Sequence, residues 1–216
     1  MFDKFFYFAT TFAEGCLAVF GMNGAFEQPA YHVRELAPPG LEIRDYGPLA
    51  AAETTVTGNP DAAFRLLFAY ISGGNDGARM IAMTAPVQQA PVQQAPVQQA
   101  PAMIAMTTPV RQDIAASGAT TMRFFLPARL AANPPKPLDP RVRITTTPPA
   151  TVAVLRYSGN PTPDQRDEKQ RALFSRLATT AWKPAGTPYF LSYDPPFTIP
   201  FLKRNEVAIA VTANSR

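Results

Sequence analysis

Imidazole and thiol groups are scarce in this sequence, and this limits the chemistry that it can perform. The chain has a single histidine, His32, and a single cysteine, Cys16. One cysteine excludes an internal disulfide and the cysteine-clustered zinc and iron–sulfur sites. One histidine excludes two-histidine metal sites and leaves one imidazole for general-base chemistry. Serine, cysteine and histidine are not arranged as a nucleophile with its base, so the sequence indicates a binding protein and not an enzyme.

Methionines in two matching segments offer a softer chemistry. Residues 80–87 read MIAMTAPV and residues 103–110 read MIAMTTPV, so a pair of methionines recurs in each copy. A thioether is polarizable and flexible, which suits an adaptable apolar pocket, and it can approach iron. Ordinary core packing is the alternative role for each side chain. The four candidates are Met80, Met83, Met103 and Met106.

A low-complexity tract separates these two copies. It is built from repeats of PVQQA, and we place an insertion at 88–102 within it. A proline at every fifth position prevents a helix and disfavours a central strand, because proline lacks the amide donor. The sequence therefore predicts an extended, polyproline-like surface loop, for which an insertion without function is the simplest account.

The elements that would position these groups begin with strands. Residues 31–36, 41–46 and 50–56 have strand character. The sequence NPD at 59–61 then supplies an N-cap, a proline at the first helical position and an acid in the first turn. We expect a first helix from there to Ile71, with a wide apolar surface against the sheet.

The second half of the chain repeats this order. Its second helix opens with TPD at 162–164 and is expected to extend to Trp182. The predicted strands of this half are 122–126, 141–146, 151–157, 189–193 and 206–211. Two halves with the order strands, helix, strands imply a pseudo-symmetric α+β domain in which each half packs one helix on a mostly antiparallel sheet.

Residues 1–22 have a helical periodicity of their own. Apolar residues recur at i, i+3, i+4 and i+7, whereas Asp3, Tyr7, Thr10 and Glu14 share the other side. The apolar face contains Phe2, Phe5, Phe6, Phe12, Leu17 and Phe20. We expect an amphipathic anchor helix that binds a membrane surface or a membrane protein complex. A signal-like segment, or a helix folded back on the domain, is the alternative.

The charged and polar residues in this stretch argue against a bilayer span, which needs about 20 predominantly apolar residues. Residues 23–29 have the Gly, Asn and Pro of a linker, and the folded domain is expected at 30–212. The protein is therefore expected to be membrane-associated or located in the cell envelope.

The charge of the chain is mildly basic. It contains 20 Lys and Arg against 16 Asp and Glu, which gives a formal net charge of +4. The basic residues are scattered singly or in pairs, without a basic stripe or a recognition-helix pattern. We do not expect a nucleic acid as partner.

Five motifs in order give the sequence a family resemblance. They are LEIRDYGP at 41–48, AFRLLFAYISGGN at 63–75, IAMTAPV at 81–87, MRFFLPA at 122–128 and YDPPFTIPFLKRNEVAIAV at 193–211. In their order and spacing they resemble the SOUL haem-binding family, from about residue 28 to the C-terminus. The resemblance implies a distorted β-barrel of two pseudo-repeats with helices on its outside. It also implies reversible binding of haem or a related tetrapyrrole, without an established enzymatic reaction.

Such a ligand needs an apolar slot, cations for its propionates and, optionally, an axial donor. The first helix offers walls for the slot, and arginines and a lysine offer cations, with core packing and surface solvation as their alternative roles. The predicted walls are Phe64, Leu67, Phe68 and Ile71. The predicted cations are Arg44, Arg65, Arg79, Lys203 and Arg204.

The axial donor is where this sequence departs from one branch of the family. An animal branch has a histidine directly before the Tyr-Gly-Pro of the first motif, and this sequence has Asp45 there. His32 is the only imidazole that remains, and Tyr46 and Tyr157 are weaker donors. The sequence therefore predicts a tetrapyrrole carrier or buffer. The alternative is a scaffold or accessory subunit that docks on a membrane complex through residues 1–22 and has no functional ligand.

Overall fold

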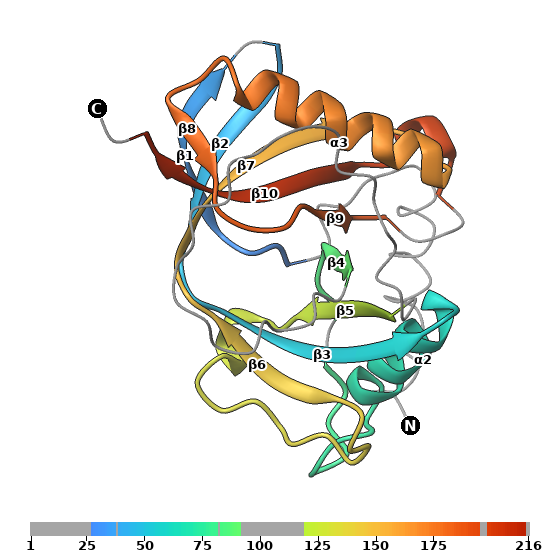
Figure 1. Cartoon of the computed structure of the whole chain (residues 1–216). Coiled ribbons are helices and arrows are strands. Elements are labelled where there is room, and N and C mark those ends of the chain that lie inside the picture. The colour runs from blue at the N-terminus through green and yellow to red at the C-terminus, as the bar shows by residue number, and fades with distance from the viewer. Residues whose placement is uncertain (1–26, 38, 82, 92–118, 195–197, 215–216) are drawn as a thin grey trace, which may run out of the picture.

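One antiparallel sheet, curled into a half-barrel, organises the fold (Figure 1). The computed structural model describes residues 27–37, 39–81, 83–91, 119–194 and 198–214. Within them the sheet has ten strands in the order β1-β2-β7-β10-β9-β4-β5-β3-β6, and β8 pairs with β10 beside this path. The predicted α+β class, with a barrel-like and mostly antiparallel sheet, is confirmed.

The two halves of the chain contribute similar sets of elements. The first half forms β1 (Tyr31–Ala37), β2 (Leu41–Tyr46), β3 (Leu49–Thr57), α2 (Pro60–Ile71), β4 (Val87–Pro91) and β5 (Ala119–Phe125). The second half forms β6 (Arg143–Thr147), β7 (Ala150–Tyr157), α3 (Pro163–Leu177), β8 (Trp182–Pro184), β9 (Tyr189–Ser192) and β10 (Asn205–Ala213). Short 3-10 turns lie at Ala128–Leu130 and Pro200–Leu202.

Both helices lie on the outside of the half-barrel, at its two ends in Figure 1. Helix α2 packs on β3 and β5, and helix α3 packs on β7, β10 and β2. The halves are interleaved, because β2 pairs with β7 and β3 pairs with β6. Helix α3 therefore covers strands from both halves of the chain, whereas α2 packs on two strands of the first half.

The helices begin where the sequence predicted. The Asn59 side chain accepts a hydrogen bond from the Asp61 amide, and Thr162 and Gln165 form a capping box. The prediction that the second helix extends to Trp182 is wrong, because α3 ends at Leu177. The Thr179 and Thr180 hydroxyls donate to the carbonyls three residues earlier, which competes with helical pairing. Trp182 belongs to the unpredicted strand β8.

Strand β4 corrects the prediction for the low-complexity tract. Residues 88–91 were expected in a surface loop, but they belong to a strand that pairs with β5 on one side and β9 on the other. The prediction failed because proline stands only at the end of VQQAP, so the amides of the intervening residues are free to pair. The remainder of the insertion, 92–102, lies outside the described residues.

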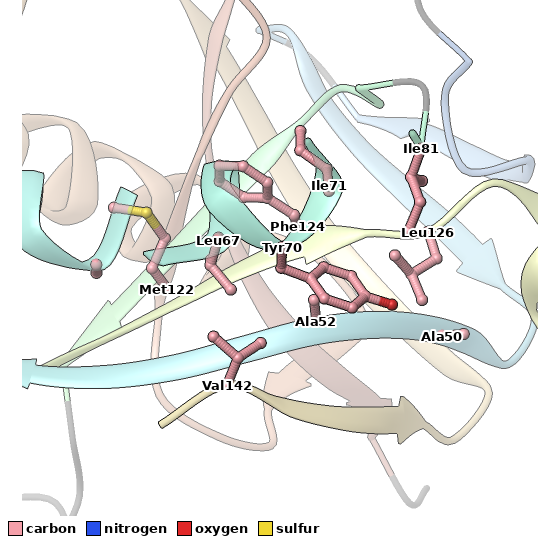
Figure 2. Packing of buried hydrophobic residues seen from close by; sticks show 11 residues of the cluster. Ala50, Ala52, Leu67, Tyr70, Ile71, Ile81, Met122, Phe124, Leu126 and Val142 are labelled. Atoms are coloured by element: carbon pink, nitrogen blue, oxygen red, sulfur yellow. The ribbon is translucent and has the colours of Figure 1, made fainter. Parts of the chain in front are cut away.

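Strand alternation divides the buried side chains among three clusters. The cluster under α2 contains Ala50, Ala52, Ala63, Leu67, Tyr70, Ile71, Ile81, Met122, Phe124, Leu126 and Val142 (Figure 2). The cluster under α3 contains Leu41, Ile43, Ala153, Leu155, Leu173, Leu177, Val207, Ile209 and Val211. The third cluster contains Ala51, Ala85, Phe125, Val152, Val154, Leu191, Tyr193 and Ala208. Its residues alternate with those under the helices, so they face the hollow of the half-barrel.

The predicted N-terminal anchor at 1–22 lies outside the described residues. In the part of the chain that the structure covers, no helix has the length and apolar character that a membrane span requires.

Candidate ligand-binding site

The hollow of the half-barrel contains a cavity of about 190 Å³. Strand β2 shows how the fold directs side chains into it. Leu41 and Ile43 pack under α3, so Tyr46 and Arg44 point to the opposite, concave face. Tyr46 lies opposite Ala150 of β7, and both residues line the cavity. The lining thus follows from the register of the sheet.

The lining is aromatic and uncharged. Its aromatic residues are Tyr31, Tyr46, Phe125, Tyr189 and Tyr193. The small residues Gly47, Ala150 and Ala210 leave the space between them. Among the residues described, no Lys, Arg, His, Asp or Glu belongs to the lining. The exposed positions of Tyr31, Gly47 and Pro148 connect the cavity with solvent.

A buried ion-pair network lies behind the tyrosines. The Arg44 guanidinium donates to both carboxylate oxygens of Glu206, with Nη1–Oε2 and Nη2–Oε1 distances of 2.9 and 3.0 Å. Arg204 Nη2 donates to Glu206 Oε1 at 2.6 Å, and the Tyr193 hydroxyl donates to Glu206 Oε2 at 2.6 Å. Arg44 Nε also donates to Glu42 at 2.8 Å. Arg44 and Glu206 are 1% and 0% exposed, so both charges depend on these partners.

The network decides which of these groups are ionised. Burial alone would raise the pKa of Glu206, but the hydrogen bonds and charges of Arg44 and Arg204, with the Tyr193 hydroxyl, hold that pKa below its ordinary value. Burial raises the pKa of Tyr193, and the negative charge of Glu206 raises it further. Glu206 is therefore a carboxylate and Tyr193 a neutral donor at neutral pH.

Aromatic rings cover the two guanidinium groups. Arg44 Cζ lies 4.4 Å from the centre of the Tyr31 ring, and Arg204 Cζ lies 4.0 Å from that of Tyr193. Tyr31 and Tyr46 pack on each other with ring centroids 5.4 Å apart. Such cation–π contacts stabilise the cations and leave ring carbon as the surface presented by these residues. Arg44 and Arg204, both predicted propionate partners, are paired with Glu206 and Glu42 and do not line the cavity.

The predicted helix walls are also not part of the lining. Leu67 is completely buried under α2, and Ile71 packs beside it (Figure 2). Phe64 stacks on Phe68 at a centroid distance of 6.0 Å, and Phe68 is 48% exposed on the outer surface. These four residues fill or flank the contact between α2 and the outer face of the sheet.

The remaining predicted donors and cations are dispersed. Met83 packs partly buried in the α2 cluster, whereas Met80 is exposed. Lys203 is buried and its Nζ donates to Asn160 at 2.7 Å. Arg65, Arg79 and Tyr157 do not belong to the lining, and both arginines are exposed. Met103 and Met106 lie outside the described residues. Of the predicted site residues that the structure describes, only Tyr46 belongs to the lining.

His32 and Asp45 lie on the other face of the sheet. They are register partners on β1 and β2, and Asp45 lies on the same face of β2 as Leu41 and Ile43, which pack under α3. The Asp45 carboxylate accepts from Thr151 Oγ1 and from Arg34 Nε, each at 2.7 Å, and these bonds lower its pKa. The departure from the family motif at position 45 therefore does not alter the cavity.

Apart from Tyr46, sequence reasoning missed the residues of the described lining, among them Tyr31, Tyr189 and Tyr193, and it missed Glu206 behind them. One signal was present. Tyr189, Leu191 and Tyr193 are spaced by two, so a strand over 189–193 places them on one face. Glu206 gave no such signal, because its ion pair with Arg44 joins residues 162 positions apart.

Comparison with known proteins identifies the family. The model of the family described as SOUL heme-binding protein matches residues 26–210. The chain belongs to this family. Membership in the SOUL family indicates a haem-binding function. None of the curated proteins compared with the chain matches it.

Solved structures share the fold of this SOUL protein at low identity. The EcmrR C-terminal domain has a TM-score of 0.53 and 9% identity, over 85% of this chain and 98% of that domain. An uncharacterized conserved protein from Listeria innocua has a TM-score of 0.53 and 10% identity, over 80% and 92% of the two chains. A hydrolase from Listeria innocua has a TM-score of 0.51 and 10% identity, also over 80% and 92%. At these identities the similarity concerns the fold alone.

A complete haem does not fit the described cavity. The volume of about 190 Å³ is below the range of about 300–1,000 Å³ that is typical of pockets for drug-sized ligands. The lining described here supplies no cation for propionates and no imidazole for iron. Its chemistry suits the apolar ring system of a tetrapyrrole, and its size admits only part of one.

Proposed function

We propose that this SOUL protein is a reversible binding module for haem or a related tetrapyrrole, and that its concave cavity receives part of the ligand's ring system. The observation that carries the proposal is the aromatic lining, in a member of a haem-binding family. Aromatic side chains offer large flat contact areas for a planar ligand. The lining includes the exposed residues Tyr31, Gly47 and Pro148, so the rest of the ligand would lie outside the cavity, toward solvent.

The proposed role is that of a carrier or buffer and not of a catalyst. The described lining offers hydroxyls and amides, from tyrosines, Thr147, Gln28 and Gln88, but no carboxylate, thiol or imidazole that could act as nucleophile or base. Without a strong axial donor, binding depends on ring contacts, which favours exchange of the ligand.

An absorption titration of the whole chain with haemin tests the proposal. We expect a saturable Soret shift at one haemin per chain. The Ala150→Phe variant should weaken haemin binding at least tenfold, because the added phenyl ring fills the space that the ligand would occupy. The matched control, Ala131→Phe, adds the same ring at an exposed turn and should bind as the unaltered chain does. A titration without saturation would refute the proposal.

A second candidate function is a scaffold or accessory subunit that associates with a membrane or a membrane protein complex through residues 1–22. The observation that favours it is the small cavity volume. Co-sedimentation with anionic phospholipid vesicles tests it, with a chain that lacks residues 1–22 as comparison. The proposal requires that the full chain sediments and that the shortened one does not.

A further inference from the structure

The volume of the cavity limits the size of what it can hold. An engineered apolar cavity of about 150 Å³ in another protein binds benzene. The cavity here is somewhat larger, at about 190 Å³, yet below the range of about 300–1,000 Å³ for drug-sized ligands. One ring or two fused rings match this space.

The charges around the cavity exclude an ionised ligand. Behind the lining, Arg44 and Arg204 face Glu206 and Glu42, so two cations are balanced by two carboxylates. The rings of Tyr31 and Tyr193 separate the guanidinium groups from the cavity. An anion that entered would lose its hydration without gaining a counter-charge, which is strongly unfavourable. A cation would find no carboxylate in the described lining, and the rings of Tyr31 and Tyr193 already contact the two guanidinium groups.

Tyr189 supplies the one lining phenol hydroxyl that is not engaged with the network. The Tyr193 hydroxyl donates to Glu206, the Tyr46 hydroxyl accepts from Arg44, and that of Tyr31 bonds with Arg204. No hydrogen bond joins the Tyr189 hydroxyl to another described residue. Burial raises the pKa of Tyr189, so the hydroxyl remains protonated and can donate.

From these observations we infer that the cavity binds an uncharged aromatic system of one or two fused rings that carries a hydrogen-bond acceptor for Tyr189. The ring system is either a free small molecule or the carboxylate-free edge of a larger one. Only the second source rests on the proposed tetrapyrrole function, and in that case the carboxylates lie outside the cavity.

Three probes of the same ring size test the charge requirement on the unaltered chain. Quinoline is uncharged at neutral pH, N-methylquinolinium is a cation, and quinoline-6-carboxylate is an anion. Ligand-observed NMR and calorimetry should give one quinoline per chain, bound at least tenfold more tightly than either ion. Equal or tighter binding of one of the ions, or no binding of quinoline, would overturn the inference.

Substitutions in the lining test whether quinoline binds in the cavity. Ala150→Phe and, from another strand, Leu49→Trp should each abolish quinoline binding, whereas Ala131→Phe should retain it. Tyr189→Phe should weaken quinoline about threefold to tenfold, as expected for one lost hydrogen bond. The same variant should leave naphthalene, which has no acceptor, unchanged. Full quinoline affinity in both folded cavity variants would place its site elsewhere and overturn the inference. If neither folds, the three charge probes still decide.

Haemin distinguishes the two sources of the ring system. If the cavity holds the edge of a tetrapyrrole, saturating quinoline displaces haemin, and haemin dimethyl ester binds as tightly as the free acid. If quinoline binds and haemin does not, the proposed function fails while the cavity remains a site for a free small molecule. If haemin binds and quinoline neither binds nor displaces it, the tetrapyrrole function stands and this inference fails.

Discussion

The two faces of the sheet are both apolar, yet only the outer face is covered by helices. Under α2 the side chains interdigitate with those of the helix, and Leu67 and Ala63 have no exposed surface. On the concave face no helix of the described part fills the hollow, and a cavity remains between rings and small residues. Hydrophobic residues are therefore not by themselves evidence of a ligand wall. Hydrophobic residues can form a ligand wall only where no other element of the fold already packs on them.

The two faces also differ in the charged side chains that they bury. The cluster under α2 consists of hydrophobic side chains, whereas the concave face buries Arg44 and Glu206 beside its aromatic rings. A buried ion pair contributes little net stability, but the loss of one partner leaves an uncompensated charge. The concave face thus combines an open cavity with a wall that is sensitive to substitution.

The largest effect is expected from Glu206→Ala. It would leave Arg44 and Arg204 without their shared carboxylate, at a cost of about 3–5 kcal/mol in the free energy of unfolding. Urea denaturation measures this, and Glu168→Ala, on an exposed side chain, should cost less than about 1 kcal/mol. A loss below about 1 kcal/mol for Glu206→Ala would show that the network is dispensable.

Substitution under α2 should affect stability and leave ligand binding intact. Leu67→Ala removes a fully buried side chain, so we expect a loss of about 2–5 kcal/mol. Phe68→Ala, on the exposed side of the same helix, should cost less than about 1 kcal/mol. Denaturation and haemin titration of both variants check this. If haemin affinity falls in either folded variant, α2 is the ligand wall after all.

Acidification should weaken the concave face by a smaller amount, because a protonated Glu206 still accepts hydrogen bonds. Its pKa in the folded state is lowered, so its stabilising contribution is present above its unfolded pKa of about 4.3. That contribution is lost as the pH falls through the lower, folded value. Denaturation from pH 7 downward should show the loss, and Glu206→Gln should show less of it. Parallel curves would assign the loss to other carboxylates, such as Asp139 with a pKa of about 2.

The smallest effect is expected from His32→Ala. The imidazole is exposed on the outer face, opposite Asp45, and is not part of the lining. Haemin affinity and the position of the Soret band should therefore stay unchanged. A lost or shifted band would mean that the only histidine of the chain binds iron, and that the ligand lies outside the cavity.

Much of the fold could be predicted from local sequence signals. Proline and its N-cap residue set the first turns of α2 and α3, and alternating residues marked most strands. The site was harder to predict, because it depends on which face of each strand the helices cover. Tyr46 was found through its motif, whereas Tyr189 and Tyr193 needed the pairing of β9 with β10. The bond between Arg44 and Glu206 depends on β2, β7 and β10 lying side by side.

The repeated sequence of strand β4 lets the chain gain or lose five residues without a change in the strand's own sequence. Strand β4 lies inside the strand order and pairs with β5 and β9, so it joins the part of the sheet under α2 to the part under α3. Its sequence VQQAP recurs without interruption at 92–96 and 97–101. Deleting any one of the three copies produces the same amino-acid sequence, in which a complete VQQAP still follows Ala-Pro. Gain or loss of five residues by replication slippage therefore preserves the sequence of the joining strand. The gene can change length here without changing the sheet.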